Sequence, residues 1–181
     1  MRILKIVGWI ALSALVICVA LFAFSYYNYF GKFPEDRNKY SDYIGHIDQE
    51  TALLNDVFTL CGEGAIYKTH HGAPKDAYNG GKNTFKKRVL ESYKTNGATE
   101  SGYVNFRFLI NCEGNPGWFE VLEIDMNYEK TNHNPEMVSQ LLSITSDPTN
   151  WSIYKVGEDP VNYYHYVSYR IENGEITEIL P

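Results

Sequence analysis

The sequence predicts an α+β protein in which an antiparallel sheet of three to four strands is covered by two to three helices and preceded by one N-terminal transmembrane helix. Three observations predict this fold. A long uncharged run follows a short basic start. Segments with alternating apolar and polar residues lie close together in the sequence on either side of turns, and other segments carry apolar residues at helical spacing. Helices segregated against one antiparallel sheet form a two-layer α+β domain. We therefore divide the chain into an anchor at 1–30, a juxtamembrane helical segment at 31–76 and an α+β domain at 77–181.

The N-terminal segment has the composition of a membrane span. Residues 6–24 carry no charge, and as a helix they would be about 29 Å long, which matches one hydrocarbon core. Arg2 and Lys5 precede this run, so we expect an uncleaved signal anchor with its N-terminus in the cytoplasm. Two alternatives remain open: cleavage by signal peptidase after Ser25, and a lipoprotein signal that ends at Cys18. All three interpretations export the rest of the chain.

In the segment between the anchor and the domain, the sequence predicts one helix, at 41–60. Residues 61–64, Cys-Gly-Glu-Gly, mark the end of this helix, and residues 65–69 are compatible with a short strand. The apolar residues of the helix recur at spacings close to the helical period, and they are Ile44, Ile47, Leu54, Val57 and Phe58.

Two more helices are expected within the domain. The first is capped by Asn83 or Thr84 and stops at Asn96-Gly97. The second begins at Asn134-Pro135-Glu136, with a cap, a first-turn proline and an acid near the positive end of the helix dipole, and Asp147-Pro148 ends it. The apolar stripes are Phe85, Val89 and Tyr93 in the first helix, and Met137, Leu141 and Ile144 in the second, with Val138 and Leu142 alongside.

The stretch from 101 to 128 predicts two antiparallel strands around a turn, and it forms the centre of the domain. Residues 113–117 contain two glycines and a proline, which are typical of a turn. So short a connection makes the flanking strands antiparallel neighbours. One face carries Val104, Phe106, Phe108, Ile110 and Cys112, then Leu122, Ile124, Met126 and Tyr128 after the turn, and Leu109 is the exception to the alternation.

The C-terminal residues predict a second hairpin. Asn173-Gly174 is a strong signal for a two-residue loop, and it follows a strand at 163–171. This loop pairs Glu172 with Glu175, Ile171 with Ile176, and Val167 with Leu180. The strand at 175–180 then lies outermost and offers unpaired backbone groups.

Charge and motif content argue against several functions. The formal net charge is −6, and it is −8 without the first 25 residues, so we expect no nucleic-acid binding. His46 and Glu50 share a helix face, but a metal site needs three or four convergent ligands, and the adjacent His70 and His71 would face opposite ways on a strand. No nucleophile elbow, CxxC or phosphate-binding glycine motif occurs. We expect no catalytic residues, no metal and no cofactor, with an exported enzyme near His70 and His71 as the alternative.

The ordered set of segments resembles the TonB C-terminal domain, most closely the divergent versions of Bacteroidetes-type bacteria. The resemblance covers roughly residues 77–171. It rests on Tyr78-Asn79-Gly80-Gly81, a helix, the run GYVNFRFLINCEGNPGWFEVLEI, a capped helix, Asp147-Pro148 with Trp151, and a last strand. The resemblance implies a periplasmic domain tethered to the inner membrane, which binds a short extended peptide of an outer-membrane transporter and transmits energy from an ion-driven motor complex.

Two departures from the family change this expectation. The chain has no Pro-rich spacer, and the terminal hairpin covers the strand edge that receives the partner in the family. We therefore expect a TonB-like binding module and do not extend this expectation to energy transduction. A partner protein would add a strand at the outermost edge, and a homodimer or a strand that merely ends the sheet are the alternatives. The residues expected at the partner are Glu175, Thr177, Ile179, Tyr164 and Tyr166, with Trp118 and Trp151 as possible contacts or core residues.

Export also predicts a disulfide between Cys61 and Cys112. Both cysteines leave the reducing cytosol, and the third, Cys18, lies in the anchor. Two buried free thiols are the alternative.

Overall fold

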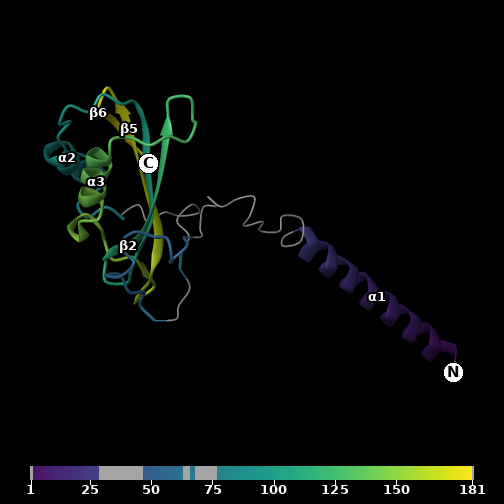
Figure 1. The fold of residues 1–181 in the computed structure, drawn as a ribbon. Coiled ribbons are helices and arrows are strands. Elements are labelled where there is room, and N and C mark those ends of the chain that lie inside the picture. Colours follow the sequence, from purple (N-terminus) through teal and green to yellow (C-terminus); the bar gives the residue numbers. More distant parts are fainter. Residues whose placement is uncertain (1, 29–46, 63–65, 68–76, 181) are drawn as a thin grey trace. The chain divides into compact units, whose positions relative to one another are not determined.

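The computed structural model describes residues 2–28, 47–62, 66–67 and 77–180 (Figure 1). It divides into two compact units, 1–44 and 45–181, which are described separately. In the first unit, helix α1 spans Arg2–Tyr26. Its stretch Lys5–Tyr26 is long and apolar enough to cross a membrane, and an N-terminal signal sequence would have the same character.

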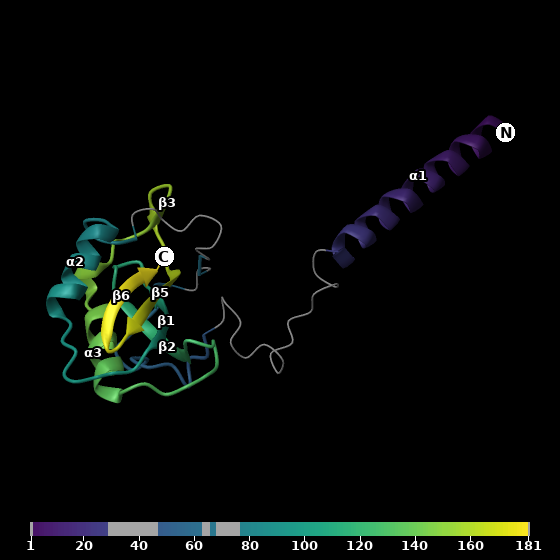
Figure 2. The same cartoon turned by 90° about the horizontal axis from the view of Figure 1, so that it is seen from above.

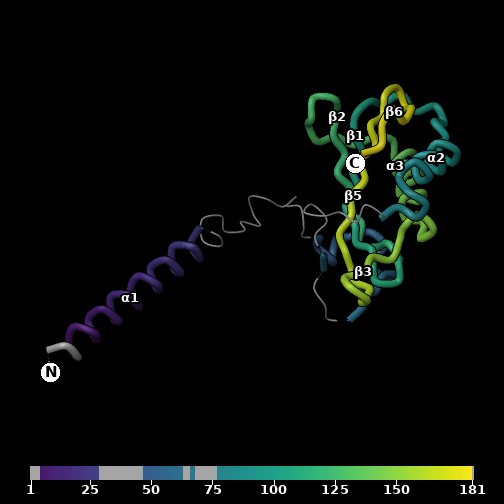
Figure 3. Tube along the Cα trace, turned by 180° about the vertical axis from the view of Figure 1, so that it is seen from behind, coloured from purple at the N-terminus to yellow at the C-terminus, as the bar shows by residue number. Residues whose placement is uncertain are grey.

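The second unit is built on a four-stranded antiparallel sheet. Its strands are β1 (Gly102–Ile110), β2 (Pro116–Asp125), β5 (Tyr163–Glu172) and β6 (Glu175–Leu180), in the order β2-β1-β5-β6 (Figure 2). Helices α2 (Lys82–Ser92) and α3 (Pro135–Thr145) cover one face of the sheet, as the view from behind also shows (Figure 3). A 3-10 turn, η2 (Pro148–Asn150), and a small ribbon of β3 (Lys155–Val156) and β4 (Asp159–Pro160) complete the fold. This arrangement confirms the predicted α+β class.

The main core lies between the sheet and the two helices. The predicted alternation in β1 is confirmed, since Val104, Phe106, Phe108 and Ile110 are all fully buried on this face. Asn134 caps α3 as predicted, because its side chain accepts hydrogen bonds from the next two free N–H groups. The capping prediction for α2 is wrong: the helix begins one residue before Asn83, and Gly81 is its N-cap without a side-chain bond. The helices contribute Phe85, Val89, Met137 and Leu141 to this core.

The second face of the sheet is partly covered by the irregular segment that precedes the domain. The helix predicted at 41–60 is wrong for 47–60, which consists of turns and extended backbone, while 41–46 lie outside the described residues. The apolar residues of this segment cover the second face of the sheet. Phe58 packs with Leu109, and this contact explains the break in the alternation of β1. Phe58 also fits against Gly117, where any Cβ atom would overlap its ring.

A disulfide joins this irregular segment, residues 47–62, which we call the covering segment, to the end of β1, as predicted. Cys61 and Cys112 are bonded, with a Cα–Cα distance of 5.9 Å. Their 51-residue separation implies about 4 kcal/mol of stabilisation by loop entropy. Cys18 in α1 is the free cysteine.

Two bulges change the strand registers from those that simple alternation predicts. In β2 the extra residue places Trp118 and Phe119 opposite Phe108, and Trp118 adopts a positive φ of 51°. Phe119 is buried in the main core, whereas Trp118 turns to the second face and packs edge-on against Phe58. The predicted pairs Glu172–Glu175 and Ile171–Ile176 are confirmed at the terminal hairpin, but Leu180 pairs with Ser168 and not with Val167. The intervening extra residue is Thr177.

Candidate functional site

The two edges of the sheet differ in how they are covered. At one end of β2, Leu53 exchanges two backbone hydrogen bonds with Phe119, of 2.8 and 2.9 Å. At the other end, the chain turns back and Thr131 N donates to Glu123 O at 3.1 Å. Between these points, the Glu120 carboxylate accepts from a backbone N–H of the covering segment. The β2 edge therefore has little room for an added strand.

The opposite edge, β6, is open. Its ladder with β5 is its inner side, and among the described residues no other backbone group is bonded to residues 175–180. The prediction that this strand lies outermost is confirmed. Unpaired N–H and C=O groups along an edge strand are a template for an added strand.

The turn that begins β6 is firmly anchored to the rest of the domain. Gly174 N donates to Glu100 O at 2.9 Å, and Asn173 N donates to the Ser101 hydroxyl at 2.9 Å. The Tyr93 hydroxyl, from the end of α2, donates to Gly174 O at 2.7 Å. Burial, and then the nearby carboxylates, raise the pKa of Tyr93, so this donor keeps its proton at neutral pH. Sequence reasoning placed Tyr93 on the apolar stripe of the helix but missed this hydrogen bond, because the partner is a backbone group 81 residues away.

The side chains predicted to meet a partner fall into three groups. Glu175 and Thr177 are exposed on the open edge, together with Glu178. Ile179, which the sequence predicts to meet a partner, is only 5% exposed and lies in the main core. The bulge at Thr177 shifts the register by one residue, and a one-residue shift moves every later side chain to the other face.

Tyr164 and Tyr166 lie away from the β6 edge. Strand β6 ends opposite Ser168, so both tyrosines are on β5 beyond the end of β6. Tyr164 is half-buried against the covering segment, and burial raises its pKa. Tyr166 is 40% exposed. The structure thus separates the predicted residues into an edge group, a core residue, Ile179, and a face group on β5.

Acidic side chains dominate the edge, with one arginine behind them. Arg170 forms ion pairs with Glu172 at 2.8 Å and Glu178 at 3.9 Å. Glu175 instead accepts a hydrogen bond from the Thr95 hydroxyl at 2.6 Å. Strand β6 itself carries no basic residue. Charges on an edge discourage indiscriminate pairing, and acidic charges favour a strand with cationic side chains.

The predicted alternative site near His70 and His71 lies outside the described residues, as does His46. His133 and His165 are described and buried. Within the described ranges, no three His, Cys, Asp or Glu side chains lie close enough together to hold a metal ion. Trp151 lies in the main core, where its Nε1 donates to Thr145 O at 2.8 Å.

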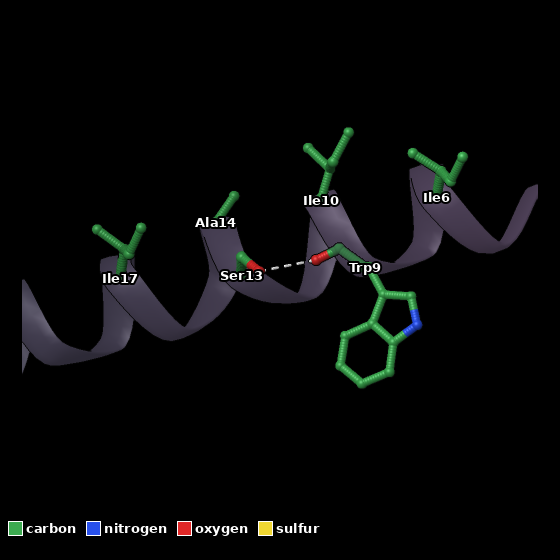
Figure 4. A pocket seen from close by; sticks show the side chains of 6 residues that line it. All are labelled: Ile6, Trp9, Ile10, Ser13, Ala14 and Ile17. Carbon is green, nitrogen blue, oxygen red and sulfur yellow. Dashed lines mark hydrogen bonds between the residues drawn. The ribbon is translucent and has the colours of Figure 1, made fainter. Parts of the chain in front are cut away.

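A shallow, open hollow on α1 offers no further chemistry. Its lining side chains come from one face of a single helix, and the hydroxyl of Ser13 is already bonded to the carbonyl oxygen of Trp9 (Figure 4). The lining residues are Ile6, Trp9, Ile10, Ser13, Ala14 and Ile17.

No related protein supports or contradicts this interpretation of the β6 edge. Comparison of the chain with known proteins found no protein-family model, no curated protein and no solved structure that matches it.

Proposed function

We propose that this chain is a membrane-anchored protein–protein interaction module, similar in role to the TonB C-terminal domain, which binds a strand of a partner protein along β6. The observation that carries the proposal is the contrast between the sheet edges. The β2 edge is bonded to residues at both ends, whereas the outer side of β6 has no backbone partner among the described residues.

Strand addition explains how such an edge would bind. Backbone hydrogen bonds supply affinity, and every second side chain of the incoming strand meets the same face of the sheet, which supplies selectivity. Because Glu175 and Glu178 are exposed on this edge, an incoming strand with lysine or arginine at alternate positions is favoured. In this proposal the terminal hairpin moves the partner-binding edge of a TonB-like sheet outward by one strand.

The proposed location is the inner membrane, with the domain in the periplasm. The apolar helix α1 and the Cys61–Cys112 disulfide support export, because disulfides persist in oxidising compartments. The proposed partner is an outer-membrane transporter or a membrane motor complex.

The test uses the full-length protein in membranes and a matched pair of variants. Thr177→Pro removes a backbone donor and bends the edge, whereas Thr177→Ala keeps the donor and removes only the side chain. We expect affinity capture, followed by mass spectrometry, to show that Thr177→Pro loses partners that the wild type and Thr177→Ala retain.

A photo-crosslinking residue provides a measurement that does not depend on the proline. Placed at Glu178 it should crosslink to the captured partner, and placed at Glu91 on the exposed surface of α2 it should not. If Thr177→Pro folds and still captures every wild-type partner, or if the crosslinks form only from Glu91, strand addition at β6 is wrong.

A further inference from the structure

His165 is a buried histidine whose imidazole has no polar partner. It lies on the helix-covered face of β5, is 4% exposed, and neither ring nitrogen has a hydrogen bond among the described residues. Its side chain contributes nothing to the β6 edge. A buried polar group without a partner is costly, so its retention in a core of apolar rings calls for an explanation.

The rings around His165 come from four separate parts of the chain. β5 itself contributes Tyr163 and Tyr166, with centroid distances of 6.4 and 6.2 Å. β1 contributes Phe108 at 5.7 Å, and the residue after η2, Trp151, lies at 5.1 Å. Tyr78, just before α2, lies edge-on at 5.2 Å. These contacts include three phenols but no carboxylate and no cation, so no described contact compensates a charge on the imidazole.

Tyr78, which lies edge-on against His165, belongs to a short segment, residues 77–79, that we call the strap. The strap is held to residues 149–152 by two backbone hydrogen bonds, Asn79 N to Asn150 O at 2.8 Å and Ser152 N to Ala77 O at 2.9 Å, and by the Asn79 side chain, whose Nδ2 donates to Thr149 O at 3.1 Å. The Tyr78 hydroxyl is itself buried without a partner. The strap is thus attached by three hydrogen bonds and by the Tyr78 ring, which packs against Phe85, Trp151 and His165.

A pair of glycines connects the strap to α2. Gly80 and Gly81 have φ angles of 79° and 85°, in the region that glycine occupies without strain. Arg88 on α2 holds the segment to which the strap is bonded, since its Nη1 donates to Thr149 O and to the Asn150 side chain. Two hydrogen bonds lie at this hinge, Gly81 N to Tyr78 O at 2.8 Å and the Thr84 hydroxyl to Gly80 O at 2.6 Å. Rotation at the two glycines that breaks the first of these bonds would lift the strap, while Arg88 keeps residues 149 and 150 bonded to α2.

We infer that residues 77–79 form an acid-released strap, in which protonation of His165 requires the strap to swing away about Gly80–Gly81. The closed strap keeps the imidazole among apolar rings, where the charged form is disfavoured. The opened strap exposes the imidazole to water, where it takes up a proton normally. Lower pH thus drives opening through this one side chain.

The direction of the pH dependence follows from the two pKa values. Burial lowers the pKa of His165 from its ordinary value of 6.5 to about 4 in the closed form. Above pH 6.5 both forms are neutral and closure is unaffected. Between pH 6.5 and 4 only the opened form is protonated, so the opening constant rises by about tenfold per pH unit and then levels off.

Native-state hydrogen exchange on the full-length protein in detergent tests the strap. The amides of Asn79 and Ser152 report the two backbone bonds between the strap and residues 150–152 that opening breaks. After correction for intrinsic exchange rates, we expect their protection to fall by about 30-fold between pH 7.5 and pH 5.0. Low concentrations of urea should not accelerate this exchange, because a local opening exposes little surface.

Two variants separate the imidazole from general acid effects. His165→Leu, or His165→Phe if the leucine variant does not fold, should abolish the pH-dependent loss of protection at both amides. His133→Asn alters the other described buried histidine and should leave the loss unchanged. Unchanged protection in the wild type at pH 5.0, a loss that persists in both His165 variants, or a loss that urea accelerates as it does for β1 amides would each overturn the inference.

Discussion

Tyr169 and Thr145 form a hydroxyl pair inside the main core. Both residues are fully buried, and their oxygen atoms are 2.7 Å apart. The Thr145 hydroxyl donates to Leu141 O at 2.6 Å, so its oxygen is free to accept from Tyr169. Burial raises the pKa of Tyr169, which keeps it protonated as the donor. This pair connects α3 to the centre of the sheet.

Removing both members of this pair should cost less than the sum of the two single losses. Thr145→Val leaves the Tyr169 hydroxyl buried without a partner, and we expect a loss of about 1–3 kcal/mol in the free energy of unfolding. Tyr169→Phe leaves Thr145 bonded to Leu141 and should cost about 1 kcal/mol. The double variant should cost clearly less than the sum of the two. Urea unfolding of all four proteins checks this, and strictly additive losses would show that the hydroxyls are not coupled.

Residue-level features were predictable where the determinant is local. The Asn134 cap follows from three adjacent residues, and the alternation from Val104 to Ile110 follows from one strand. The positive φ of Trp118 was not predictable, since tryptophan has no preference for that region and the neighbouring Gly117 packs against Phe58, which is distant in the sequence.

At the scale of elements, the bulge in β6 decides which side chains the edge presents. Without an extra residue, Glu178 would enter the core and Ile179 would face outward, as simple alternation predicts. With Thr177 as the extra residue, Ile179 pairs with Tyr169 on the core face and Glu178 pairs with Arg170 on the other. Burial of an isoleucine and exposure of a glutamate both favour the bulged register.

Deleting Thr177 should therefore be tolerated, although it shortens the chain within a strand. Ile176 and Glu178 would become neighbours, and the existing pairs of Glu178, Ile179 and Leu180 would continue in a regular ladder. We expect the free energy of unfolding to change by less than about 1 kcal/mol, with Ile179 still protected from solvent. Loss of about 1.5–3 kcal/mol in urea unfolding, the amount expected for exposing one isoleucine, would contradict this register.

Elements were predictable from the sequence to very different degrees. Both hairpins and the two domain helices follow from periodicity and turn residues within single segments. The segment at 47–60 was predicted as a helix because its apolar spacing resembles a helical stripe. Its backbone instead pairs Leu53 with Phe119, and a contact so distant in the chain overrides local periodicity.

On the scale of the whole molecule, α1 is followed by an independent folded unit, and the two differ in composition. Among the described residues, the two clusters that form the core of that unit contain no residue before Ile47. The apolar run in α1 is longer than the usual core of a cleaved signal, so we expect it to remain attached. An uncleaved helix of this kind would make α1 the membrane anchor of the domain.

The mass of the protein extracted from membranes measures this directly. We expect the full chain of 20.8 kDa, recovered with the membrane fraction. A secreted protein with a known cleaved signal, expressed in the same cells, controls for working signal peptidase. A mature N-terminus at Tyr26 or at Cys18 would show that the segment is a signal sequence and not an anchor.

The Cys61–Cys112 bond also determines how tension would pass along the chain. A pull from the N-terminal side would reach Cys61 and cross directly to Cys112, so the backbone of the intervening residues, which include α2 and β1, would carry none of the force. Reduction would insert the 51-residue separation into the path, which at about 3.5 Å per residue adds up to about 180 Å. The oxidised chain is therefore a short, stiff mechanical link, and the reduced chain is a long, compliant one.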